Sequence, residues 1–181
     1  ITAIRLRLGG KLIWDVTGTA LDAINQYMGE TANAAYLTLN FAERQARTIV
    51  GEEIGAIDTS LPYSGFSMEV DIGGATAPTL AGWADRSAPQ PGRPHQALFR
   101  TITKAIEAPG AAGVLNLDMP LGSDKGTLIK RIHMFHSNIT EFAVKKNGLD
   151  LQDQGEIALI QFEQNELART TQAGHFAYDP I

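Results

Sequence analysis

Hydrophobic and polar residues alternate in the first stretch of the chain, AIRLRL, which places Ile4, Leu6 and Leu8 on one face of an extended segment. A period of two residues is typical of a strand with one buried face. Gly9 and Gly10 follow this stretch, and a pair of glycines readily adopts the positive φ angles of a tight turn. We therefore predict a β-hairpin in which KLIW forms the returning strand.

A helix is predicted after this hairpin, because the apolar positions in TALDAINQYMG recur every three or four residues. We expect Thr19 to cap its N-terminus and Gly29 to end it. Trp14 and Trp83 lie in predicted strands and are expected in the core, with stacking on a sugar as the alternative. Alternation predicts further strands in the following stretches: YLTLNF (36–41), FSMEVDI (66–72), TLAGWADRS (79–87), ALFRTITKAI (97–106), GVLNLDM (113–119) and TLIKRIHMF (127–135).

The pattern of the first hairpin occurs a second time near the end of the chain. Ile139 lies 138 residues after the first residue, and the dipeptide Ile-Thr stands at both places. Asn147 and Gly148 take the place of the glycine pair, and Asn-Gly is the strongest two-residue hairpin signal. A returning strand (LDLQ), a helical stretch (GEIALIQFEQNELAR) and the start of another strand (HFAYDPI) follow in the same order. The sequence therefore predicts a duplicated unit.

The fold class predicted from this order is all-β. Many short strands, with one short helix inserted in each copy, favour two Greek-key β-sandwiches over alternating βα units. Sandwiches of this kind are jelly rolls, so we expect a double jelly roll. Three of the eight prolines lie within Pro89–Pro94, a stiff stretch that suits a connector, and we predict domains at 1–92 and 93–181. Each copy lacks strands that the other has. We therefore expect the first roll to miss its N-terminal strands here and the second its C-terminal strands.

Composition narrows the classes of function. The net charge is −5, and the densest basic clusters are pairs such as Lys130-Arg131, which argues against a nucleic-acid-binding surface. The absence of cysteine excludes disulfides, thiolate metal sites and a cysteine nucleophile. No apolar run approaches the ~18 residues of a membrane span. Because the acidic residues are scattered, none can be paired for catalysis. We predict no catalytic residue and no bound cofactor.

One stretch has the residue types of a metal site. In GTLIKRIHMFHSNITEFAVKKNG, His133, His136 and Glu141 stand between two glycines, and this spacing resembles the metal-binding motif of cupins, which are also jelly rolls. Cupins place two histidines one residue apart on a strand, so that both point to the same face. His133 and His136 are separated by two residues, and alternation therefore puts them on opposite faces. We predict no metal site and keep these three residues as the fallback set.

Three long stretches carry a resemblance to a known family. They are AIRLRLGGKLIWDVTGTALDAINQYMG, MEVDIGGATAPTLAGWADRSAPQPG and KRIHMFHSNITEFAVKKNG. Together and in this order they resemble the major coat protein of tailless, membrane-containing icosahedral phages of the corticovirus type. The resemblance covers most of the chain, although no catalytic signature anchors it.

The resemblance implies a structural role. Members of this family are double jelly rolls that form trimers of pseudo-sixfold outline, and the trimers tile a shell over an internal lipid membrane. The implied partners are other copies of the chain, further virion proteins at the vertices and the internal membrane, with no direct contact to nucleic acid. The implied location is the virion, after synthesis in the cytoplasm of a bacterial host. A structural cation at subunit contacts is compatible with such a shell, but no ligands can be named for it.

Two other classes of function remain open from the sequence. A β-sandwich could serve as a carbohydrate-binding or other recognition module. A cupin-like, metal-dependent enzyme is the third class, and it would use the fallback set His133, His136 and Glu141. Sugar-dependent tryptophan fluorescence would favour the recognition module, whereas a stoichiometric metal would favour the enzyme.

Overall fold

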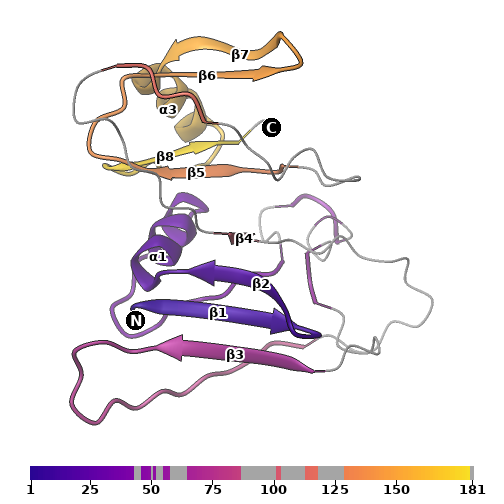
Figure 1. Ribbon diagram of the computed structural model, residues 1–181, viewed down its shortest axis with the longest axis vertical. Coiled ribbons are helices and arrows are strands. Elements are labelled where there is room, and N and C mark those ends of the chain that lie inside the picture. Colours follow the sequence, from indigo (N-terminus) through magenta and orange to yellow (C-terminus); the bar gives the residue numbers. More distant parts are fainter. Residues whose placement is uncertain are drawn as a thin grey trace. The chain divides into compact units, whose positions relative to one another are not determined.

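The fold is described from a computed structural model, shown in Figure 1. It describes residues 1–42, 46–49, 51, 55–57, 65–86, 101–102, 113–117 and 129–179. The chain divides into two compact units. The first comprises Ile1–Asn25 and Thr31–Thr103, and the second comprises Gln26–Glu30 and Lys104–Ile181. The described secondary structure is mainly β-strand, which agrees with the predicted all-β class.

A four-stranded sheet forms the centre of the first unit. Its order is β3-β1-β2-β4, and Figure 1 shows the first three strands side by side. Strand β1 pairs antiparallel with β2 and with β3, whereas the short β4 runs parallel to β2. The bounds are Ala3–Leu8 for β1, Lys11–Val16 for β2, Phe66–Asp71 for β3 and Thr101–Ile102 for β4.

The turn between β1 and β2 confirms the predicted hairpin. Gly9 has φ 57° and Gly10 has φ 76°, the left-handed pair that a two-residue turn of type I′ requires. The ladder then runs from Leu8 opposite Lys11 towards Ile4 opposite Val16, with one irregularity beside Leu6.

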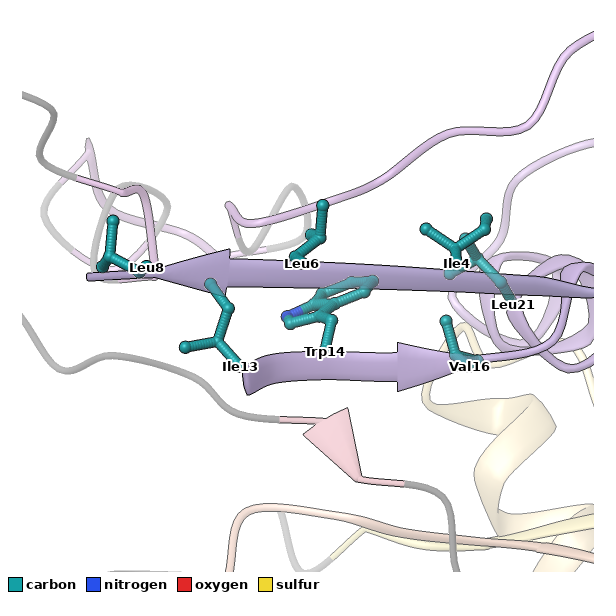
Figure 2. Close-up of a cluster of buried hydrophobic side chains, with 7 residues drawn as sticks. All are labelled: Ile4, Leu6, Leu8, Ile13, Trp14, Val16 and Leu21. Atoms are coloured by element: carbon teal, nitrogen blue, oxygen red, sulfur yellow. The ribbon is translucent and has the colours of Figure 1, made fainter. Parts of the chain in front are cut away.

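The core of the first unit lies on one face of this hairpin. Leu6 is fully buried, and its alternate neighbours on β1 are buried with it (Figure 2). Trp14 is buried, as predicted, and meets the ring of Phe41 edge-on at 5.4 Å. The cluster consists of Ile4, Leu6, Leu8, Ile13, Trp14, Val16 and Leu21.

Helix α1 (Gly18–Tyr27) follows the hairpin, as predicted, but starts earlier. The Ala20 N–H donates to the Thr17 hydroxyl at 3.2 Å, so Thr17 and not Thr19 is the N-cap. Strand β2 ends at Val16, so the helix begins directly after Thr17, two residues before the predicted cap. Gly29 has φ 87° and donates its N–H to the Gln26 carbonyl at 2.9 Å, which confirms it as the helix end.

Three predicted strands are wrong where the structure describes them. Residues 36–41, 79–86 and 113–117 carry no strand. In the first of these, Leu37 and Phe41 still pack against the core of the sheet. The side chain of Asn25 donates to the Thr38 carbonyl at 2.8 Å, a contact that a ladder would otherwise supply. Alternation therefore predicted which side chains face the core, where they are partly buried, but it did not predict that the segment pairs with no strand in the described part of the chain.

The second unit contains two small sheets and a helix. Strand β5 (Ile132–Phe135) pairs antiparallel with β8 (His175–Tyr178), and β6 (Glu141–Lys146) pairs antiparallel with β7 (Leu149–Glu156). Helix α3 (Ile157–Glu166) follows β7 directly. The Gln164 amide on α3 donates to the Ala177 carbonyl on β8 at 2.7 Å, and the Phe142 ring on β6 meets Phe176 at 5.0 Å. These contacts join the helix and both sheets.

The second hairpin repeats the position of the first and, next to the turn, its register. Strand β6 lies 138 residues after β1 at both ends, and β7 starts 138 residues after β2. The turn residues Asn147 and Gly148 have φ 52° and 78°. The pair Val144 opposite Gln152 corresponds to Leu6 opposite Trp14, and both hairpins have a register shift at this point. This shared bulge confirms the predicted repeat of hairpin and helix, although β6–β7 has a further irregularity between Phe142 and Val144. The described residues do not make up a complete double jelly roll.

Several predictions fall outside the described residues. They include the Pro89–Pro94 connector and most of the stretch 97–106, of which Thr101–Ile102 forms β4. Among the described residues, no helix is long and apolar enough to cross a membrane.

Candidate functional site

The histidines singled out in the sequence lie at the pairing of β5 with β8. In this ladder Phe135 stands opposite His175, and His133 stands opposite Ala177. Because successive side chains alternate between faces, His133 and His175 are diagonal neighbours on one face of the sheet. His136 follows the last residue of β5, and its N–H donates to the Gly174 carbonyl at 2.9 Å.

The two diagonal histidines form a close pair. The Nδ1 atom of His133 lies 3.1 Å from the Nε2 atom of His175, and the two rings are stacked, with centroids 5.3 Å apart and planes 13° from parallel. Tyr27, which belongs to the second unit, meets both rings edge-on at 5.8 and 5.6 Å. Since one imidazole nitrogen must donate and the other must accept, this geometry fits two neutral histidines.

A buried carboxylate, Asp179, and two arginines lie at the end of the same β5–β8 sheet. One oxygen of Asp179 lies 2.9 Å from Nε of Arg131 and 3.0 Å from a terminal nitrogen of Arg169. The Asp179 side chain is 4% exposed and that of Arg169 is 7% exposed. The Arg169 guanidinium also lies 5.8 Å from the centre of the Tyr27 ring. A single buried carboxylate is therefore shared by two arginine side chains.

Burial dominates the proton equilibria of this cluster. Burial first, and then His175 and Arg131, lower the pKa of His133 to about 3. Burial likewise lowers the pKa of His175 to about 4, with a contribution from His136. The hydroxyl of Tyr27 has its pKa raised to about 12, first by burial and then by Asp179. At neutral pH the histidine pair and the tyrosine are therefore uncharged.

His136 and Glu141 line a groove and are not part of the stacked pair. The Ile139 N–H donates to Nδ1 of His136 at 3.2 Å, and burial lowers the pKa of this imidazole. Both residues line an open groove of about 620 Å³ beside the start of α3. Glu141 is exposed and stands opposite Glu156 in the β6–β7 ladder. Within the described part of the chain, no three His, Cys, Asp or Glu side chains are grouped to hold a metal ion.

His175, Arg169 and Asp179 were not singled out from the sequence. Alternation in HFAYD does place His175 and Asp179 on one face of a strand. The pairing of β8 with β5 joins segments 42 residues apart, and no local pattern indicates it. The alternation within each strand can be recognised in the sequence, but the pairing of the two strands cannot.

The two tryptophans have opposite environments. Trp14 lies in the core, as predicted, whereas Trp83 is 81% exposed and is not in a strand. The prediction of a core position for Trp83 is therefore wrong. Its ring lies 6.5 Å from that of Tyr36, which is also exposed. The stretch around Trp83 has no strand beside it within the described residues, so alternation alone did not bury the ring.

Comparison with known proteins assigns the chain to a family. The family model of the viral coat protein P2 N-terminal domain matches residues 1–87, and that of the viral coat protein P2 C-terminal domain matches residues 99–181. Neither the comparison with curated proteins nor the comparison with solved structures finds a match for the chain. The two matched domains follow each other in order and leave only residues 88–98 between them. The chain therefore belongs to the viral coat protein P2 family, and its role is that of a structural protein of the virion capsid.

Proposed function

We propose that this coat protein is a double jelly-roll subunit, that three copies form a trimer of pseudo-sixfold outline, and that these trimers tile an icosahedral shell over an internal membrane. The proposal rests on the hairpins β1–β2 and β6–β7, which share their 138-residue offset, and on the register that they share next to the turn. Two similar units in one chain allow a threefold assembly to present six similar faces to its neighbours. This arrangement corresponds to the corticovirus-type resemblance of the sequence.

Exposed apolar side chains support self-assembly. Phe66 and Met68 on β3 are about half exposed, and Leu149 and Leu151 on β7 are 66% and 51% exposed. Apolar groups that gather at a surface are typical of interaction sites. In a coat protein the expected partners are other copies of the chain, with further virion proteins at the vertices and the membrane beneath the shell.

The absence of catalysis and metal binding is part of the proposal. His133 and His175 are held as a neutral pair, while His136 and Glu141 lie at a separate groove. We also propose a domain boundary between residues 92 and 93, synthesis in the cytoplasm of a bacterial host, and no direct contact with nucleic acid. The net charge of −5 supports the last point.

The assembly proposal is tested by the mass of the purified protein in solution. Sedimentation and light scattering should give three times the mass of one chain, and electron microscopy should show particles of hexagonal outline. Replacing Leu149 and Leu151 together with serine should weaken association if β7 lies at a contact. Asp150→Asn, between them on the same strand, is the matched control. A monomer at every concentration, or a trimer without pseudo-sixfold outline, contradicts the proposal.

A second function, recognition of carbohydrate by the shell surface, is favoured by the exposed Trp83 and Tyr36 rings. Exposed aromatic rings present flat apolar faces with a polar edge. Titration with a panel of oligosaccharides should then change tryptophan fluorescence in the wild type and not in Trp83→Ala. Because Trp14 is buried, the Trp83→Ala variant retains a tryptophan that does not face solvent. Unchanged wild-type fluorescence across the panel contradicts this function.

A further inference from the structure

The two ring nitrogens that face each other in the stacked histidine pair cannot both carry a proton. His133 Nδ1 and His175 Nε2 are 3.1 Å apart, so a neutral pair shares one hydrogen bond. A first added proton still leaves one donor and one acceptor between these atoms. A second proton makes both nitrogens donors, and two N–H groups then face each other. The doubly protonated pair can exist only if the rings separate.

The surroundings of the pair disfavour even the first proton. Arg131, just before β5, is a positive charge that acts on His133, and Asp179, just after β8, is shared by Arg131 and Arg169. Arg169 follows α3 and also lies over the ring of Tyr27. His136, just beyond β5, acts on His175 as a further basic group. The carboxylates Glu141 and Glu156, on β6 and β7, line the groove beside His136.

The pair is also part of the packing of β8. His175 is 3% exposed, and Phe176 and Ala177 beside it are 1% exposed. Phe135 on β5 lies against His175 with ring centroids 5.0 Å apart. Separation of the two imidazoles therefore requires separation of the strands that carry them.

We propose that the His133–His175 pair makes the β5–β8 sheet an acid-sensitive element of this coat protein, in which proton uptake by the pair opens the sheet. The element belongs to the second unit, in which both histidines of the pair lie. Acidification then loosens one of the two repeats and leaves the core of the other packed.

The sign of the effect follows from the pKa values. Both histidines have pKa values in the folded state (about 3 and about 4) below the ordinary value of 6.5. The unfolded state therefore binds protons first as the pH falls. The stabilisation is fully present above pH 6.5 and is lost as the pH falls from 6.5 towards 4 and then 3. In this window each histidine lowers the folding equilibrium constant by up to about tenfold per pH unit.

The test is an NMR titration of the 181-residue chain with labelled histidine rings, from pH 7.5 to pH 4.5. We expect the rings of His133 and His175 to stay neutral until the amide signals of His175–Tyr178 disappear, while those of Ala3–Leu8 persist. If either ring becomes protonated near pH 6.5 with the β8 signals intact, the proposal is wrong. Loss of the β1 and β8 signals at the same pH also overturns it, because the opening would not then be confined to the second unit.

Variants distinguish protonation of the histidine pair from other effects of low pH. The double variant His133→Gln, His175→Gln keeps hydrogen-bonding groups that do not titrate. In this variant the amide signals of β8 should therefore persist between pH 6.5 and 4.5. His95→Gln removes a histidine of the first unit and should leave the loss of the β8 signals unchanged. An unaltered loss in the double variant contradicts the proposal. If that variant does not fold, the titration of the wild-type rings decides alone.

Discussion

The hairpins β1–β2 and β6–β7 share their turn geometry and, from the turn to Leu6 and Val144, their register and bulge, but they differ in burial. Ile4, Leu6 and Leu8 are buried on β1, whereas β6 carries partly buried residues at the first two equivalent places and the exposed Lys146 at the third. Strand β1 has a partner on both edges. Within the described residues, β6 pairs with β7 alone. The difference teaches that local sequence determines a hairpin, while its neighbours determine how much of it is core.

The largest expected effect comes from the core position of this comparison. Leu6→Ala should lower the free energy of unfolding by about 2–5 kcal/mol, because the side chain is fully buried and its loss leaves a cavity. The equivalent Val144→Ala should cost less than about 1 kcal/mol, since Val144 is only partly buried and fewer atoms are lost. Denaturant unfolding of both variants measures the difference. Equal losses would show that the two hairpins are equally packed in solution.

Substitutions in the two turns should lower the stability by similar amounts, unlike the substitutions in the two cores. Gly10 and Gly148 both have positive φ, and an added Cβ meets nothing within 4 Å at either place. Gly148→Val and Gly10→Val should each cost on the order of 1–2 kcal/mol, because the strain lies in the backbone and not in contacts. Melting temperatures of the two variants provide the measurement. A negligible loss at Gly148 would mean that the second turn is not held in its left-handed form.

The smallest effect distinguishes the two helices. The Thr17 hydroxyl accepts from the Ala20 N–H at the start of α1, whereas Glu156 at the start of α3 makes no side-chain cap. Thr17→Ala should therefore cost about 1 kcal/mol. Glu156→Ala should be close to neutral, since it removes no such bond. Circular dichroism during thermal unfolding compares them, and a larger loss at Glu156 would contradict the assignment of caps.

Short-range features were predictable because their cause is local. The glycine pair at 9–10 and Asn147-Gly148 require left-handed turns whatever surrounds them, and alternation placed Leu6 in a buried row. The candidate site was predictable only in part. His133 and His136 stood out in the sequence as part of the fallback set, but His175 and Asp179 reach His133 and Arg131 through a ladder that joins β5 to β8. Pairing over that distance depends on tertiary folding and not on a local pattern.

The sequence by itself determined the repeat of hairpin and helix, the two tight turns and the apolar row of β1. Each depends on the conformational preference of a few adjacent residues or on a period of two. Only the tertiary structure decided that 36–41 and 79–86 are not strands, that Trp83 is exposed while Trp14 is buried, and that Thr17 caps α1. It also decided that His133 is stacked on His175. The physical reason is that a strand needs a neighbouring edge for its backbone hydrogen bonds, and a buried side chain needs a surface to cover it. Both are supplied by segments far away along the chain.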